Sequence, residues 1–172
     1  QIAILPKGTT APGSTDNAYK SSGTKIEYKT YVENHGWKEY SADGNQNGTT
    51  GQAKAVQALA ARVNDTQYSG DIVYDTYMQS YGWTGQKSNN VTAGLPNGGK
   101  RMEAIKVSLT GELAEHYDIY YRTYTQSYGW LDWAKNGESA GTKDFAKRIE
   151  AVQMKLVQKG GTAPGATSTA FK

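Results

Sequence analysis

Two glutamates, Glu103 and Glu150, are the first candidates for chemistry, because glycoside hydrolysis needs a pair of carboxylates. They occupy the same place in two related segments, RMEAIKVSL and RIEAVQMKL, and Gln57 takes that place in a third segment, AVQALAARV. Catalytic residues are normally unique in a chain, so a repeated glutamate indicates a structural hydrogen bond. We therefore expect no glycosidase chemistry from this pair.

Histidine and cysteine offer no other catalytic group. The two histidines, His35 and His116, do not occupy equivalent places, and His35 stands where the related segments have tyrosine. Cysteine is absent, which excludes thiol nucleophiles, disulfides and zinc knuckles. The sequence therefore predicts no catalytic residue, no metal site and no cofactor, and we expect the protein not to be an enzyme.

The aromatic residues point instead to binding or packing. The chain has 13 Tyr and 4 Trp but only 2 Phe, and Tyr and Trp combine an apolar body with a polar tip. Three Gly-Trp pairs recur, with tryptophans 46 and 47 residues apart at Trp37, Trp83 and Trp130. An exposed indole can stack on a sugar ring, but we expect these three tryptophans to fill the core, because a small β domain needs such large apolar groups.

A tyrosine and an amide recur two residues apart on what we expect to be the solvent face of a strand. The pairs are Tyr77 with Gln79, Tyr124 with Gln126, and, with a carboxylate in place of the amide, Tyr31 with Glu33. A ring to stack on a sugar and an amide to pair with its hydroxyls would make a carbohydrate subsite. The structural alternative is a cross-strand pair that stabilises the sheet.

Two further aromatic residues are expected at the surface. Trp133 aligns with Tyr40 in the first unit and with Gln86 in the second. Because a core position does not usually accept glutamine, we expect Trp133 and Tyr40 to face solvent and to be the first ligand contacts.

These residues belong to three units of about 47 residues, at 26–66, 72–110 and 119–157. Each unit begins with an alternating aromatic segment, which predicts a strand, and ends with a second alternating segment. In the first unit this last segment, AKAVQALAARV, has the composition of a helix. We nevertheless predict a strand, because its two counterparts alternate.

The two ends of the chain repeat each other. KGTTAPGSTDNAYK at 7–20 is identical to KGGTAPGATSTAFK at 159–172 in 9 of 14 positions. We expect residues 7–25 and 158–172 to be linker-like tails of a larger array, with residues 1–172 forming one domain. Residues 1–5, QIAIL, are expected to add a strand that closes the fold.

The order of these parts resembles the ChW repeats, clostridial hydrophobic repeats named for a signature tryptophan. The third unit is the closest match, through IYYRTYTQSYGWLDWAKNGESAG and KRIEAVQMKL, and the second matches through IVYDTYMQSYGW and KRMEAIKVSL. Tyr31, Tyr77 and Tyr124 stand where the family often has histidine, and Glu33 and Gln57 depart from its pattern. The resemblance implies secretion and display at the bacterial surface, and it implies no chemistry.

Three equivalent units predict an all-β fold with pseudo-threefold symmetry, because closing three units on one another removes exposed sheet edges. A β-prism-like arrangement is expected first, a β-trefoil second and a linear solenoid third.

The distribution of charge and the hydropathy limit which classes of partner the protein can bind. The net charge of +3 is scattered without a basic block, which argues against nucleic acid, and no segment has the length of a membrane span. Two functions remain for a secreted or surface-attached protein. One is a non-catalytic module that binds a glycan or cell-wall polymer, and the other is a protein-binding adhesion domain or structural spacer in a surface array.

Overall fold

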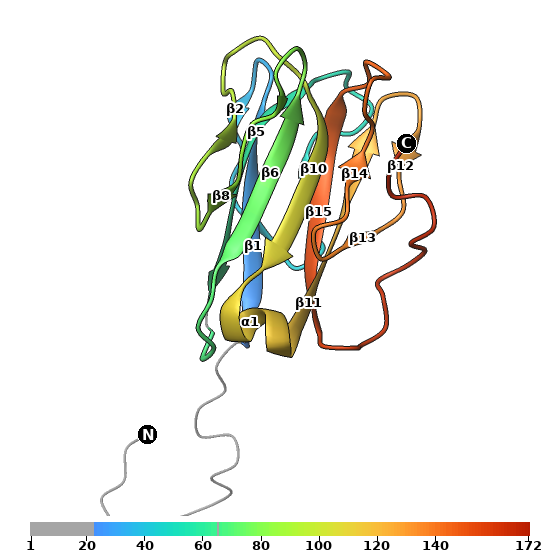
Figure 1. Ribbon diagram of the computed structural model, residues 1–172. Helices are drawn as coiled ribbons and strands as arrows, with labels where there is room; N and C mark the ends of the chain where they lie inside the picture. The colour runs from blue at the N-terminus through green and yellow to red at the C-terminus, as the bar shows by residue number, and fades with distance from the viewer. Residues whose placement is uncertain (1–22, 65) are drawn as a thin grey trace, which may run out of the picture.

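Each repeat forms two long strands with three two-residue strands between them (Figure 1). The computed structural model describes residues 23–64 and 66–172. The first repeat contains β1 (Lys25–Val32), β2 (Gly36–Trp37), β3 (Ser41–Ala42), β4 (Asn47–Gly48) and β5 (Val56–Asn64). The second contains β6 (Ile72–Met78), β7 (Gly82–Trp83), β8 (Lys87–Ser88), β9 (Ala93–Gly94) and β10 (Met102–Leu109). A short helix, α1 (Gly111–His116), leads to β11 (Tyr117–Thr125), β12 (Gly129–Trp130), β13 (Ala134–Lys135), β14 (Ala140–Gly141) and β15 (Ile149–Gln158).

The predicted strands are confirmed, including the one with a helix-like composition. The even-numbered residues of β6, from Ile72 to Met78, are buried, and the odd-numbered residues between them are partly exposed. Residues 56–64 form β5, which pairs with β1 along its whole length. Pairing in the sheet thus overrides the helical propensity of the alanine-rich segment.

The three sheets are joined into a ring by an exchange of short strands. The long pairs are β1 with β5, β6 with β10, and β11 with β15, all antiparallel. Strand β9 of the second repeat pairs with β5 of the first, β14 of the third with β10 of the second, and β4 of the first with β15 of the third. This ring confirms the expected closed arrangement of three equivalent units, because a linear solenoid would not return to its first repeat.

Glycine is required where each short strand crosses to the neighbouring sheet. A Cβ on Gly48, Gly94 or Gly141 would lie only 2.3–2.5 Å from a backbone carbonyl oxygen of the partner strand. All three glycines also have positive φ, between 98° and 116°. The close approach of the two backbones therefore depends on the missing side chain.

Tyrosine, rather than the signature tryptophan, fills the core between the sheets. Strands β1, β6 and β11 bury Tyr28, Tyr74 and Tyr121 completely, among the aliphatic residues of the other strands. Each phenol donates a hydrogen bond to a backbone carbonyl 17 residues later in its own repeat. Burial raises the pKa of Tyr28 to about 12 and also raises the pKa of Tyr121.

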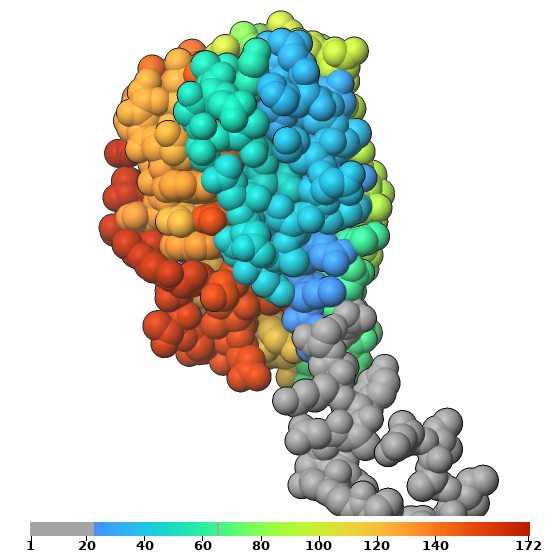
Figure 2. Space-filling model, turned by 180° about the vertical axis from the view of Figure 1, so that it is seen from behind, coloured from blue at the N-terminus to red at the C-terminus, as the bar shows by residue number. Residues whose placement is uncertain are grey.

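The last residues of the chain pack onto the third repeat. Figure 2 shows the red C-terminal segment lying along the orange third repeat. The linker-like tail expected at 158–172 thus contacts the domain: Gln158 is the last residue of β15, and Phe171 forms a parallel bridge with Gly141 of β14. The strand expected at 1–5 and most of the tail expected at 7–25 lie outside the described residues. Among the described residues, no helix has the length and apolar character to cross a bilayer.

Candidate binding site

The signature tryptophans lie on the outer faces of the sheets, so the prediction that they fill the core is wrong. Trp37 is 36% exposed, and Trp83 and Trp130 are half-buried. In each repeat the Gly-Trp strand folds back on the end of the first long strand and sets the indole beside an outward-facing tyrosine. The ring centroids are 5.7 Å apart for Tyr31 and Trp37, 5.5 Å for Tyr77 and Trp83, and 5.6 Å for Tyr124 and Trp130, all edge to face.

Each of these indoles also carries a cation from its own domain. The charged groups of Lys29, Lys106 and Arg122 lie 5.0, 4.4 and 4.8 Å from the ring centroids of Trp37, Trp83 and Trp130. Cation–π attraction of this kind uses the ring face that a sugar would otherwise cover. The signature tryptophans therefore stabilise the outer faces of the sheets through these ring and cation contacts.

Trp133 is buried, which corrects the prediction that it faces solvent. Its exposed fraction is 5%, because the C-terminal segment covers it and Arg122 stacks between it and Trp130. Tyr40 is half-buried, with its hydroxyl hydrogen-bonded to Asn90 and with cations of Lys29 and Arg62 over its ring. The exposure of Trp133 could not be inferred from Gln86. Gln86 is exposed in the second repeat, whereas the C-terminal segment covers the equivalent place in the third.

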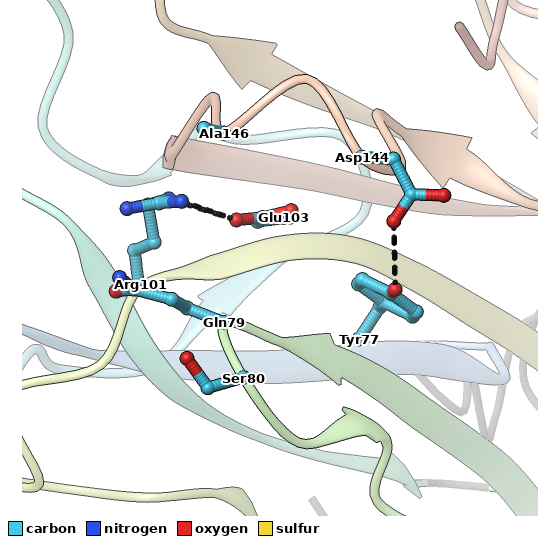
Figure 3. A pocket seen from close by; sticks show the side chains of 7 residues that line it. All are labelled: Tyr77, Gln79, Ser80, Arg101, Glu103, Asp144 and Ala146. Atoms are coloured by element: carbon cyan, nitrogen blue, oxygen red, sulfur yellow. Dashed lines mark hydrogen bonds and ion pairs between the residues drawn. The ribbon is translucent and has the colours of Figure 1, made fainter.

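Two of the predicted site residues, Tyr77 and Gln79, line a hollow of about 280 Å³ at the junction of the second and third repeats. Ser80, Arg101 and Glu103 complete the second-repeat side, and Asp144 and Ala146 of the third repeat lie opposite (Figure 3). The exchange of β14 into the second sheet brings the loop after Gly141 to this place. We call this hollow the junction pocket.

Paired charges hold the junction pocket in shape. Arg101 donates from Nη2 and Nε to Glu103 Oε1, at 2.7 and 2.8 Å. The Tyr77 hydroxyl donates to Asp144 Oδ1 at 3.1 Å, across the repeat boundary (Figure 3). Desolvation and the Asp144 carboxylate together raise the pKa of the Tyr77 phenol. The pocket thus offers a carboxylate, an amide, a hydroxyl and a phenol, which are groups that hydrogen-bond to alcohols.

Two strongly exposed aromatic side chains adjoin the lining residues in the chain, and sequence reasoning missed both as contacts. Tyr81, next to Ser80, is 63% exposed, and Phe145, between Asp144 and Ala146, is 53% exposed. The signal for Phe145 was its occurrence in a charged loop, TKDFAKR, where a phenylalanine has no strand to pack on. Neither ring is among the residues that line the pocket, and both are exposed at the surface.

The other two predicted Tyr pairs lie at the equivalent places of the third and first sheets, and only the third keeps the ion pair. Tyr124 and Gln126 lie on the outer face of the third sheet, beside an Arg148–Glu150 ion pair of 2.8 Å. Tyr31 and Glu33 lie at the first junction, where Ala55 and Gln57 replace the Arg and the Glu of the ion pair. The substitutions in the first repeat remove both charges together, which is consistent with a structural pair.

A family model describes the same three units. The model named clostridial hydrophobic W matches residues 31–65, 77–111 and 124–158, more than half of the chain. The protein belongs to the ChW family. Neither a curated protein nor a solved structure matches the chain significantly. Each ChW match begins at the tyrosine of a Tyr-x-Gln or Tyr-x-Glu pair, so the junction positions are part of the repeat itself.

The repeated glutamates of the ChW module lie in different sheets. Glu103 and Glu150 are the bulged residues of β10 and β15, and each is buried beside an arginine two residues away. His35 is exposed, and His116 stacks on Tyr68 with ring centroids 3.7 Å apart. Within residues 23–64 and 66–172 there is no group of three or more His, Cys, Asp or Glu side chains placed to hold a metal.

A buried carboxylate ties the end of the third ChW repeat to the segment that follows it. Asp118 accepts from Lys135 at 2.9 Å, from Lys159 at 3.2 Å and from the Gly160 amide at 3.1 Å. Burial alone would raise the pKa of Asp118, but these hydrogen bonds, with one from Asn136, outweigh it and hold the pKa well below its usual range.

Proposed function

We propose that this ChW module is a non-catalytic carbohydrate-binding domain that attaches to a cell-wall glycan. The observation that carries the proposal is the junction pocket, where the polar groups of Gln79, Ser80 and Asp144 converge with the ring of Tyr77. Sugar recognition combines hydrogen bonds to hydroxyl groups with stacking of the apolar sugar face on an aromatic ring. The polar lining supplies the hydrogen-bonding groups, and Tyr77 supplies an aromatic ring.

The size and charge of the junction pocket favour a single sugar unit. Its volume of about 280 Å³ lies just below the usual range of ligand pockets, which is about 300–1,000 Å³. Arg101 is already paired with Glu103, so Asp144 is the carboxylate available to a ligand. A neutral or amino sugar suits this lining better than an anionic one.

Several features support a binding role at the cell surface rather than an enzymatic one. The buried glutamates are repeated and ion-paired, as structural residues are. The ChW family resemblance implies secretion and surface display. We therefore propose an extracellular, surface-attached module whose partner is a glycan polymer. Three equivalent junctions on one polymer raise the effective concentration of each weak site.

Binding to purified cell wall tests the proposal. We expect a dissociation constant on the order of 0.1–1 mM per site, or about 4–5.5 kcal/mol. Replacing Gln79 by alanine together with Tyr77 by phenylalanine should abolish sedimentation with the wall, since it removes two polar groups that line the pocket. The matched control is Val91→Ala, which alters an exposed apolar side chain that does not line the pocket. Equal binding by both variants would refute the junction pocket as the site.

The alternative function is an adhesion or spacer domain, and one observation favours it. The C-terminal segment packs on the third repeat, as expected of a module that holds its neighbours at a set distance. A wild-type protein that binds neither wall material nor any glycan on an array would favour this alternative.

A further inference from the structure

The C-terminal segment is bound like a peptide in a recognition groove. The Trp133 amide donates to the Ala166 carbonyl at 2.8 Å, and the Asp132 amide donates to the Thr169 carbonyl at 3.2 Å. Further on, the Gly141 amide donates to the Ala170 carbonyl at 2.9 Å. The segment thus adds to the edge beside β14, a mode of recognition in which main-chain bonds give affinity.

Side-chain contacts select which segment fits. Gly165 lies so close to the Trp133 indole that a Cβ would come 3.1 Å from Nε1, and Ala170 is buried. Asp132 Oδ2 accepts from the Thr169 amide at 2.8 Å and from the Ser168 hydroxyl at 3.1 Å. We call the site formed by Asp118, Asp132, Trp133 and Gly141 the tail groove.

The same chain carries a second segment with these features. Residues 7–20 match residues 159–172 at 9 of 14 positions, with Gly13 in the place of Gly165 and Ala18 in the place of Ala170. Lys7 and Gly8 stand where Lys159 and Gly160 hold Asp118. The small residues at Gly165 and Ala170 are therefore present at both ends of the chain, whereas Thr9 stands in the place of Gly161, where a Cβ would come 2.8 Å from Val157 Cγ1.

We propose that the tail groove of one copy binds residues 7–20 of a second copy, so that copies join head to tail. The contact uses different surfaces on the two partners, and such heterologous contacts build open chains. In the intact protein the groove is filled by residues 159–172, which are tethered to it and therefore compete at high effective concentration. Joining takes place when that segment is displaced.

One of the five differences between the segments removes a contact with the tail groove directly. Asp16 stands in the place of Ser168, whose hydroxyl donates to Asp132. Two carboxylates would then meet, and a hydrogen bond would be lost. We expect residues 7–20 to bind about tenfold more weakly than residues 159–172, and Asp16→Ser to recover most of that loss.

Peptide binding to the full chain tests the groove. The receptor carries Ala18→Asp and Ala170→Asp, which block both of its own segments, and circular dichroism checks that it folds. Fluorescent peptides of residues 7–20 and 159–172 should both bind, as measured by anisotropy, and a 7–20 peptide with Ala18→Asp should not. The proposal is overturned if the 7–20 peptide fails to bind, with or without Asp16→Ser.

Sedimentation tests the joining of copies. The full chain with Ala170→Asp alone should form dimers and larger species above the dissociation constant of the 7–20 peptide. Adding Ala18→Asp should return it to a monomer. A single variant that stays monomeric at such concentrations would overturn head-to-tail joining.

Discussion

Gly48 of the first repeat lies against Glu150 of the third so closely that a Cβ would come 2.4 Å from the Glu150 carbonyl oxygen. This contact is where the ring of three repeats closes, through the pairing of β4 with β15. The fold therefore depends on a position at which any side chain would push two repeats apart.

Gly48→Ala should destabilise the protein by about 3–5 kcal/mol, because it adds a backbone clash to a left-handed conformation. Urea unfolding measures the loss. Gly51→Ala is the matched control, since Gly51 also has positive φ but a Cβ added to it would meet no atom within 4 Å. The control should lose only about 1–2 kcal/mol. Equal losses would mean that the close approach does not matter.

Trp83→Ala should cost about 1–2.5 kcal/mol, the combined worth of an edge-to-face pair and a cation–π contact at a half-exposed site. The loss should be smaller than for Tyr74→Ala, which truncates a fully buried ring and should cost about 3–5 kcal/mol. Thermal or urea unfolding of both variants makes the comparison. A larger loss of unfolding free energy for Trp83→Ala than for Tyr74→Ala would mean that Trp83 contributes to stability as a core residue does.

Trp133→Ala should both destabilise the domain, by about 3–5 kcal/mol, and release the C-terminal segment. This replaces the expectation from sequence that the substitution would leave folding nearly intact. Trypsin reports the release, because cleavage after Lys159 should accelerate once its contacts with Asp118 loosen. Tyr81→Ala, which alters an exposed ring, should not change the cleavage rate.

Acid should weaken the domain through Asp118. Its pKa is lower in the folded protein than in the unfolded chain, so its contribution is present above the ordinary aspartate pKa of about 3.9. It is lost as pH falls through the folded value. Asp118→Asn should therefore lower the urea midpoint at pH 7 and make less difference at pH 2.5. A difference that grew on acidification would contradict the assignment.

Local patterns in the sequence predicted the strands and the threefold repeat, but not which aromatic residues are buried. The alternation of β6 identifies its two faces, and Tyr74 follows the buried one. Trp83 cannot be assigned this way, because its burial depends on how a two-residue strand folds back beside Tyr77. A short strand carries too few residues to show a period.

For a related reason, the sequence predicted only some of the residues of the candidate site. Tyr77 and Gln79 belong to one strand and recur, so the sequence marks them. Asp144 and Ala146 reach the same pocket only because β14 crosses into the second sheet. Trp133 was misplaced because the segment that covers it lies more than 30 residues later in the chain. Contacts between distant segments leave no local signature.

The exchange of short strands has consequences for folding during synthesis and for the evolution of the repeat number. Every sheet lacks one strand until a neighbouring repeat supplies it. Strand β4 in the first repeat pairs with β15, which lies roughly a hundred residues later in the chain. A nascent chain therefore cannot complete its fold until the third repeat has left the ribosome. By the same reasoning, a gene duplication or deletion that keeps the ring intact must copy or remove three repeats at a time.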